Sequence, residues 1–341
     1  MAVDIFHDLA DFAAAERRAG RPPDARPFFQ SPAWFACLAQ HTLAPGTRIR
    51  IYRGQPDETG CALACKVPPA GRRLESLTSD YAVTYGPSGP APAMPEAALG
   101  AIAGQIARER WPCVRLWFLT DPAAVAGLVG AFRAAGMAAA ATAYNATWWS
   151  DVRDQNYDTY LARRPARLRN TIARRERRAA RDGVTFTLAT QADPDALAAY
   201  RTVYTGSWKP AERSPEMIPA VCAAAAQHGA LRLGVLWRGG DPLAAQIWLV
   251  SGATAVIYKL AHLPAGEPFS AGTLLTARMM AAVGFEPGVE TVSFGYGDDG
   301  FKALWMDHRS PVQAVEAAPW LSLGAARLAA GRLKRRARVG K

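Results

Sequence analysis

The feature that most constrains the fold is a stretch of three strand-like runs between residues 231 and 263. The runs read LRLGVLW, PLAAQIWLV and TAVIYKLAHL, and only the short separators RGGD and SGA stand between them. Glycine, aspartate and serine in such separators form tight turns, which join neighbouring strands in antiparallel fashion. The stretch therefore predicts an antiparallel meander in the second half of the chain.

The remaining segments alternate between helical and strand-like patterns. Several helices are predicted to begin where a capping side chain precedes a proline, as at Ser31-Pro32, Asp121-Pro122 and Asp193-Pro194. The second half places two helices before the meander, and a helix, a strand, a helix and a strand after it. We expect an α/β (α+β) fold with mixed, mostly antiparallel sheets flanked by helices.

The composition is that of a globular protein. A chain of 341 residues, half of them hydrophobic, suggests two domains, and no run approaches the roughly 18 apolar residues of a membrane span. Asp4, Asp8 and Asp11 interrupt the apolar part of the N-terminal segment, which is not the pattern of a secretory signal, so we expect a cytoplasmic protein. The five cysteines are odd in number and loosely spaced, which predicts reduced thiols and no metal site.

The net charge of +11 favours an anionic partner. Residues 161–181 hold nine arginines and one acid, Glu176. Three interpretations stay open: the arginines bind phosphates of CoA or of a nucleotide- or lipid-linked sugar, they bind tRNA, or they face solvent. The absence of interleaved aromatic residues speaks against RNA. A second basic segment, residues 324–341, is predicted either to lie on anionic membrane as an amphipathic helix or to be a solvated terminus.

A series of short motifs carries a resemblance to a known superfamily. They read LRNTIARRERRAARDG, YTGSWK, GDPLAAQIWLV, YKLAHLP, FSAGTLL and FGYGDDGFKALWM within residues 160–306, with FFQSPAWFACLAQ near the N-terminus. In this order they resemble GNAT-superfamily acyltransferases of the FemAB-like and cellulose-biosynthesis (CelD-like) acetyltransferase branch. The resemblance implies tandem GNAT-like domains: a degenerate one at 1–145, an acyltransferase domain at 146–320, and a basic tail at 321–341.

The segment from the third strand-like run to FSAGTLL is the predicted donor site. In GNAT domains acyl-CoA, commonly acetyl-CoA, lies between two diverging strands, and its pyrophosphate rests where the following helix begins. Unpaired N–H groups and the positive end of the dipole favour an anion there, and small residues allow close approach. An ordinary capped core helix is the alternative. The expected cofactor-binding residues are Lys259, Leu260, Ser270, Ala271, Gly272 and Thr273.

Two further motifs supply candidate catalytic and substrate-binding residues. The resemblance places Lys302 near a substrate phosphate, whereas a helix lysine paired with Asp298 is the plain alternative. The candidate bases are His262, Asp298 and Asp299, although the aspartates also suit helix capping and the histidine a structural role. Strand alternation predicts Tyr258 and His262 on one face and Lys259 on the other. The remaining expected substrate contacts are Trp208, Lys209, Gln246, Tyr258, Arg167 and Arg169.

We therefore expect an N-acyltransferase that moves an acyl group, acetyl by preference, from acyl-CoA to an amine. By resemblance the acceptor is an amino sugar of an envelope polysaccharide or its precursor. The absence of a convincing Ser/His/Asp or Cys/His set favours direct transfer. Two alternatives stay open: a Fem-type aminoacyl-tRNA-dependent transferase, and a non-catalytic GNAT-like module that binds a nucleotide or docks a partner.

Overall fold

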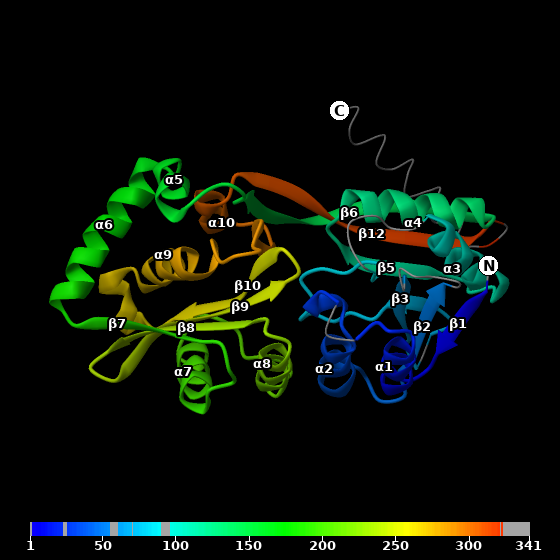
Figure 1. The fold of residues 1–341 in the computed structure, drawn as a ribbon, viewed down its shortest axis with the longest axis horizontal. Coiled ribbons are helices and arrows are strands. Elements are labelled where there is room, and N and C mark those ends of the chain that lie inside the picture. Colours follow the sequence, from blue (N-terminus) through cyan, green and yellow to red (C-terminus); the bar gives the residue numbers. More distant parts are fainter. Residues whose placement is uncertain are drawn as a thin grey trace. The chain divides into compact units, whose positions relative to one another are not determined.

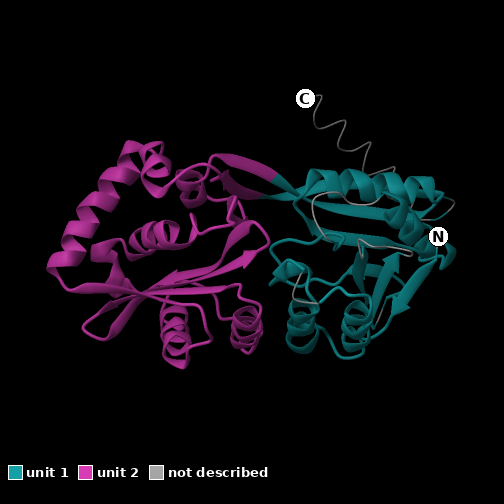
Figure 2. Ribbon diagram, in the orientation of Figure 1, with its two compact units in different colours: residues 1–146, 311–341 teal, residues 147–310 magenta. Residues whose placement is uncertain are grey.

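The computed structural model describes residues 2–22, 26–54, 61–69, 71–89, 96–320 and 322. The chain divides into two compact units (Figure 2). Unit 1 comprises Met1–Ala146 and Pro311–Lys341, and unit 2 comprises Thr147–Ser310. The basic tail predicted for residues 321–341 lies outside the described residues, apart from Ser322.

Unit 1 is a sheet with helices packed on it (Figure 1). Its strands hydrogen-bond in the order β1-β2-β3-β4-β5-β12, and these neighbours are antiparallel except the parallel pair β4 and β5. Ser31 and Asp121 cap the helices as predicted, each accepting a hydrogen bond from a first-turn backbone N–H. The elements are β1 (Val3–Phe6), α1 (Leu9–Arg18), the 3-10 helix η2 (Phe28–Gln30), α2 (Pro32–Thr42), β2 (Arg48–Gly54), β3 (Ala62–Val67), β4 (Leu74–Ser76), α3 (Glu96–Arg108), β5 (Val114–Leu119), α4 (Pro122–Ala134), most of β6 (Met137–Asp151) and most of β12 (His308–Pro319).

Unit 2 contains the predicted meander. Strands β8, β9 and β10 pair antiparallel in sequence order, which confirms the mostly antiparallel mixed fold, and the strand order is β7-β8-β9-β10-β11-β6. Figure 1 shows α7 and α8 on one face of this sheet and α9 on the other. The elements are α5 (Tyr157–Ala162), α6 (Ala166–Arg181), β7 (Val184–Ala189), α7 (Pro194–Thr205), α8 (Met217–Gln227), β8 (Leu231–Arg238), β9 (Asp241–Ser251), β10 (Thr254–His262), the 3-10 helix η3 (Pro264–Phe269), α9 (Ala271–Val283), β11 (Thr291–Tyr296) and α10 (Gly300–Trp305).

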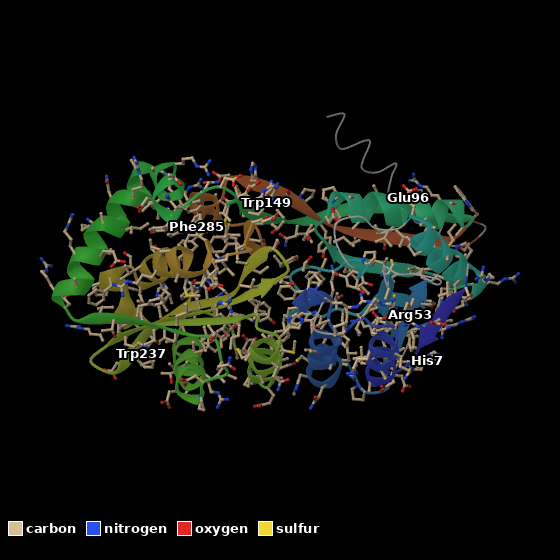
Figure 3. All side chains as sticks on the ribbon, viewed as in Figure 1. His7, Arg53, Glu96, Trp149, Trp237 and Phe285 are labelled. Atoms are coloured by element: carbon tan, nitrogen blue, oxygen red, sulfur yellow. The ribbon has the colours of Figure 1, made fainter. Side chains whose placement is uncertain are left out.

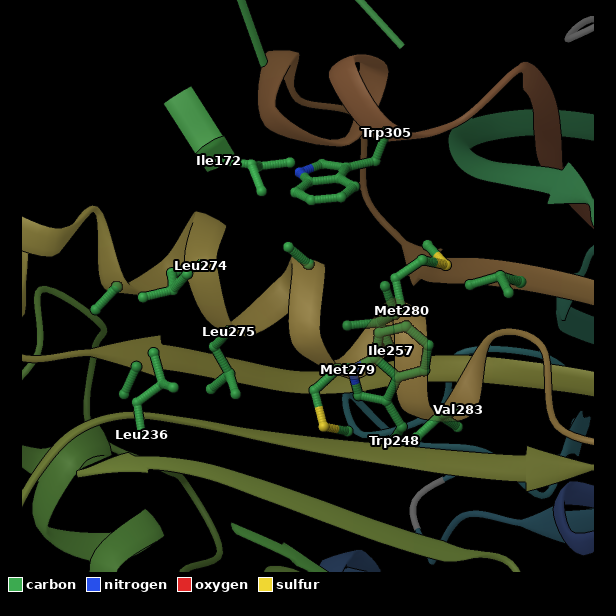
Figure 4. Close-up of a cluster of buried hydrophobic side chains, with 14 of the residues drawn as sticks. Ile172, Leu236, Trp248, Ile257, Leu274, Leu275, Met279, Met280, Val283 and Trp305 are labelled. Carbon is green, nitrogen blue, oxygen red and sulfur yellow. The ribbon is translucent and has the colours of Figure 1, made fainter. Parts of the chain in front are cut away.

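Helix α9 is buried on two sides, which explains why its sequence is apolar almost all round. Leu275 and Met279 pack toward Trp248 of the sheet, whereas Ile172 of α6 and Trp305 of α10 close the other side (Figure 4). All of these side chains are at most 5% exposed. Side chains fill the layers between helices and strands in both units (Figure 3).

The last strand of each half of the chain completes the sheet of the other half. In unit 1, β12 pairs with β5 from Gln313↔Leu119 to Ala317↔Val114. In unit 2, the end of β6 pairs with β11, from Thr291↔Asp151 to Tyr296↔Thr147. The expected C-terminal domain of 146–320 therefore does not match the contacts: residues from Pro311 onward belong with unit 1, because β12 is bonded there.

A membrane-spanning helix or a metal centre would change the class of protein. In these residues no helix is long and apolar enough to cross a membrane. Within the same ranges, no group of three or more His, Cys, Asp or Glu side chains is arranged to hold a metal ion. All five cysteines are free thiols, and four of them are buried.

Candidate functional site

The central feature of unit 2 is a fork between β10 and β11. The two strands pair in parallel only from Thr254↔Thr291 to Val256↔Ser293. Beyond Val256, β10 continues along β9, while Tyr296 at the end of β11 pairs with Thr147 of β6. Among the described residues, one edge of β10 therefore has no strand partner from Ile257 onward.

A β-bulge lies at the same point. The register of β10 against β9 shifts between Ile257 and Lys259, so Tyr258 is the extra residue. The Lys259 ammonium lies 5.7 Å from the centre of the Tyr258 ring and 5.8 Å from that of Tyr204 on α7. The expectation that Tyr258 shares a face with His262 is therefore wrong, because the bulge breaks the alternation and groups Tyr258 with Lys259.

His262 and Leu260 lie against the first turn of α9. A Cβ built on Gly272 would stand 3.1 Å from Cδ2 of His262 and 3.9 Å from Cδ1 of Leu260. Ala271 is only 1% exposed, and Gly272 is also buried. The small residues at this helix start thus serve close packing on β10, in addition to any role in admitting a ligand.

Arginines of α6 reach the start of α9. Ser270 has a left-handed backbone (φ 47°, ψ 52°) and its side chain makes no capping hydrogen bond. Its hydroxyl instead accepts a hydrogen bond from Nε of Arg175 at 3.1 Å. Arg175 and Arg178 both donate to the carbonyl oxygen of Pro268, at 2.6 and 3.1 Å. The alternative interpretation of Ser270 as an ordinary side-chain cap is therefore wrong, while its predicted contact with the cofactor stays a prediction.

The helix start is electropositive. The first turn of α9 contains no acidic residue. Partial burial, followed by the charges of Arg174 and Arg178, lowers the pKa of Arg175. Positive side chains here add to the dipole of a 13-residue helix, so an anion would be stabilised at this end.

The loop between α7 and α8 brings two more predicted residues to the fork. The Trp208 ring lies 4.5 Å from the His262 ring, and the Lys209 ammonium lies 5.6 Å from the centre of the Trp208 ring. Trp208 is nevertheless 63% exposed. Nδ1 of His262 is 3.2 Å from the carbonyl oxygen of Leu263. Because a carbonyl oxygen only accepts, this contact places the proton on Nδ1 and leaves Nε2 of the neutral ring as an acceptor.

Three lysines and two carboxylates lie beside the fork, namely Lys209, Lys259, Lys302, Glu212 and Asp299. The Lys302 ammonium donates to the carbonyl oxygens of Tyr296 and Gly297, at 2.8 and 3.2 Å, and lies 3.7 Å from Asp299. Gly297 has φ 118°, and a Cβ there would come within 2.8 Å of the ammonium nitrogen. Glycine is therefore required for this close approach.

The charges of this cluster act on one another. Burial lowers the pKa of Lys209, and the neighbouring Lys259 lowers it further. Burial also lowers the pKa of Lys302, against the opposing effect of Asp299. The Lys259 ammonium donates to the Glu212 carboxylate at 2.9 Å. Glu212 was missed in the sequence because an acid in a proline-flanked loop carries no signal of its own.

Asp299 and Asp298, adjacent in sequence, have different environments. Asp299 caps α10 by accepting hydrogen bonds from two backbone N–H groups. The Asp298 carboxylate accepts from Trp148 at 2.9 Å and pairs with Arg309. The contact with Arg309 has the largest effect, followed by that with Trp148, and together they lower the pKa of Asp298 to about 2. Such a carboxylate is a weak general base, which speaks against the predicted catalytic role of Asp298.

Gln246 lies in the core. Its side chain is 0% exposed, accepts from the Trp248 indole at 2.8 Å and donates to the Thr276 hydroxyl at 2.7 Å. Thr276 in turn donates to the carbonyl oxygen of Gly272 at 2.8 Å. The structure therefore replaces the predicted substrate contact with a core link between β9 and the start of α9.

The arginines chosen from the sequence are not those that reach the fork. Arg167 and Arg169 are exposed on α6, and Arg169 donates to the carbonyl oxygen of Ala162 at 3.0 Å. Arg175 and Arg178 instead contact the start of α9. Only the packing of α6 on α9 distinguishes them, because all four arginines have the same helical sequence context.

Comparisons with known proteins agree with this geometry. Residues 166–303 match the model of the family described as "Acetyltransferase (GNAT) domain". The structure is similar to FemX (TM-score 0.63, 12% identity, covering 92% of this chain and 96% of that one). It is also similar to the C-terminal domain of a putative lysylphosphatidylglycerol synthetase from Agrobacterium fabrum (TM-score 0.57, 16% identity, covering 91% and 92%). No curated protein matches the chain.

The similarity to the GNAT acetyltransferase domain therefore lies within unit 2. The structural neighbours, at such low identity, show the fold. The narrower FemAB-like or CelD-like membership stays a prediction.

Proposed function

We propose that unit 2 is an N-acyltransferase that moves an acyl group, acetyl by preference, from acyl-CoA to an amine. The observation that carries this proposal is the fork: β10 and β11 separate after Val256 and Ser293, directly beside the start of α9. A thioester held in such a fork meets main-chain donors on one side and a positive helix end on the other.

The residues present fit the anionic part of such a donor. First-turn N–H groups of α9, from Ala271 to Thr273, have no partner within the helix. The guanidinium of Arg175 lies at Ser270, and no acid stands in the first turn. We infer that Arg175 and Arg178 contact donor phosphates. The sequence had named two other arginines of this helix, Arg167 and Arg169, as substrate contacts.

Transfer to an amine requires a polarised carbonyl and removal of one proton. The bulged edge of β10, around Tyr258 and Lys259, supplies main-chain N–H groups for the carbonyl oxygen. The amine nitrogen attacks the thioester carbon, the carbon–sulfur bond breaks, and CoA leaves as the thiol. His262, through Nε2, and Asp299 are the candidate acceptors of the amine proton.

The acceptor is proposed by resemblance to be an amino sugar of an envelope polysaccharide or its precursor. The exposed Trp208 suits a sugar face. Lys209 and Lys302 suit an anionic group on the same molecule. Contact of residues 324–341 with anionic membrane stays a prediction, to be checked by sedimentation of the chain with and without them on anionic liposomes.

Calorimetric titration with acetyl-CoA tests the donor. We expect saturable binding that Arg175→Ala weakens about tenfold, the size of one charge-assisted contact. Arg169→Ala is the matched control, because it removes an arginine of the same helix that does not reach α9. Absence of heat with millimolar acetyl-CoA would count against the proposal.

The second candidate is an aminoacyl-tRNA-dependent transferase. It is favoured by the exposed face of α6, where Arg167, Arg174, Arg177 and Arg181 have no ion-pair partner among the described residues. Co-purification of RNase-sensitive nucleic acid, lost when these four arginines are replaced by glutamine, would support it. If the protein binds neither acetyl-CoA nor RNA, the remaining hypothesis is the non-catalytic docking module.

A further inference from the structure

Beneath the bulge of β10, three side chains lie around the Lys259 ammonium. Its nitrogen is 2.9 Å from the Glu212 carboxylate, and the rings of Tyr204 and Tyr258 lie within 6 Å. Tyr200 stands beside this group, with its ring 5.7 Å from that of Tyr204. A carboxylate combined with aromatic faces is the arrangement that binds organic ammonium ions. We call these four residues the ammonium cage: Tyr200, Tyr204, Glu212 and Tyr258.

The cage contains a polar group that the protein leaves unsatisfied. The Tyr200 hydroxyl is buried and has no hydrogen-bond partner among the described residues. Burial raises the pKa of Tyr200 well above its usual range, and the charges of Glu212, Tyr204 and Tyr258 raise it further. An unsatisfied buried hydroxyl is unfavourable, and an N–H of a bound amine can supply the missing bond.

The position of the cage relates it to the proposed reaction. Tyr258 is the bulge residue and Lys259 follows it, both in the part of β10 that has no β11 partner. An amine nitrogen held by Glu212 therefore stands next to the edge proposed to polarise the acyl carbonyl. Another half-buried ion pair of this unit, Arg232 with Glu286, joins β8 to the segment that follows α9 and makes no cation–π contact among the described residues.

We propose that the ammonium cage is the subsite for a protonated primary amine of the acceptor, and that Lys259 occupies it as an internal competitor until the acceptor displaces it. The proposal rests on the proposed function for the identity of the ligand as an acceptor. It restricts that acceptor to molecules whose reacting amine is cationic and unhindered when it binds.

The test uses n-butylammonium chloride as the probe and n-butanol as its uncharged counterpart, titrated calorimetrically. We expect Lys259→Met to bind n-butylammonium about tenfold more tightly than the unaltered protein, because the competitor is gone while the side-chain volume is kept. Glu212→Gln and Tyr200→Phe, each added to Lys259→Met, should reverse this gain. Equal affinity before and after Lys259→Met, or after Glu212→Gln, overturns the proposal, and so does an equal gain for n-butanol.

Arg232→Met is the matched control, since it opens an ion pair of similar burial outside the cage and should leave n-butylammonium affinity unchanged. If Lys259→Met does not fold, Lys259→Gln takes its place. It should also bind n-butylammonium more tightly than the unaltered protein does, with no such gain for n-butanol. Unchanged n-butylammonium affinity overturns the proposal.

The two proposals fail separately. Acetyl-CoA is titrated into the same unaltered protein. If acetyl-CoA does not bind, the acyltransferase assignment is contradicted, and the n-butylammonium titrations still test the ammonium cage. Acetyl-CoA binding with no ammonium response contradicts the cage alone.

Discussion

At the scale of single residues, the role of a buried polar side chain depends on its hydrogen-bond partners. Gln246 reads in the sequence as a polar residue in an apolar strand, which requires either a structural or a ligand partner. The structure supplies three linked hydrogen bonds, from Trp248 through Gln246 and Thr276 to the carbonyl oxygen of Gly272. This chain ties the sheet to the start of α9.

We therefore expect Gln246→Leu to destabilise the protein by about 1–3 kcal/mol, because the Trp248 N–H loses its acceptor in the core. Urea denaturation followed by circular dichroism measures this. Gln191→Leu, a glutamine in the turn before α7, is the control. A large rise in acceptor KM with unchanged stability would instead restore the substrate role.

At the scale of elements, a buried charge in the segment between α5 and α6 holds the C-terminal end of α10. The Arg164 guanidinium, its side chain 3% exposed, donates to the carbonyl oxygen of Trp305 at 2.6 Å and pairs with Asp307. The Ser150 hydroxyl donates to the same carboxylate at 2.8 Å. These contacts fix the end of α10, which carries Lys302 to the fork.

Asp307→Asn should destabilise the protein by about 2–3 kcal/mol at neutral pH. This is at the lower end of the range for breaking a buried ion pair, because Asp307 is partly exposed. Burial opposes ionisation, but Arg164 and Ser150 prevail and lower the pKa of Asp307. The stabilisation is therefore present above the ordinary carboxyl pKa and is lost as the pH falls through the lowered value.

Thermal unfolding of both proteins at several pH values measures this, and the two midpoints should converge in acid. Asp151→Asn, at an exposed pair with Arg153, should leave the midpoint unchanged. A constant difference between the Asp307 variant and the unaltered protein at all pH values would contradict the assignment.

At the scale of the whole molecule, the exchanged strands make each unit depend on the opposite half of the chain. Val315 and Ala317 of β12 are buried in the core of unit 1 with Leu116 of β5. Thr147–Asp151 of β6 pairs in unit 2. Unit 1 therefore lacks one strand of its sheet until residues 313–317 have been synthesised.

Val315→Asp should destabilise unit 1 by several kcal/mol, because a charge enters an apolar core. Hydrogen exchange followed by mass spectrometry should show protection lost first in β5 and α4 and retained in β8 and β9. Gln313→Asp, at a partly exposed position of the same strand, is the control. Simultaneous loss of protection in β5 and β9 would contradict this order.

The sequence by itself determined the mixed, mostly antiparallel fold, the meander from Leu231 to His262 and the caps at Ser31 and Asp121. Each of these depends on local periodicity, turn residues or a hydrogen bond within one turn. It also pointed to Trp208, His262 and Lys302, which the structure places around one fork.

Only the tertiary structure decided which arginines reach α9, that Tyr258 turns toward Lys259, that Gln246 is satisfied in the core and that β12 belongs with unit 1. These outcomes depend on a strand register and on the packing of helices that are far apart in the chain. A bulge of one residue reverses the side on which a side chain lies, and no local pattern records it.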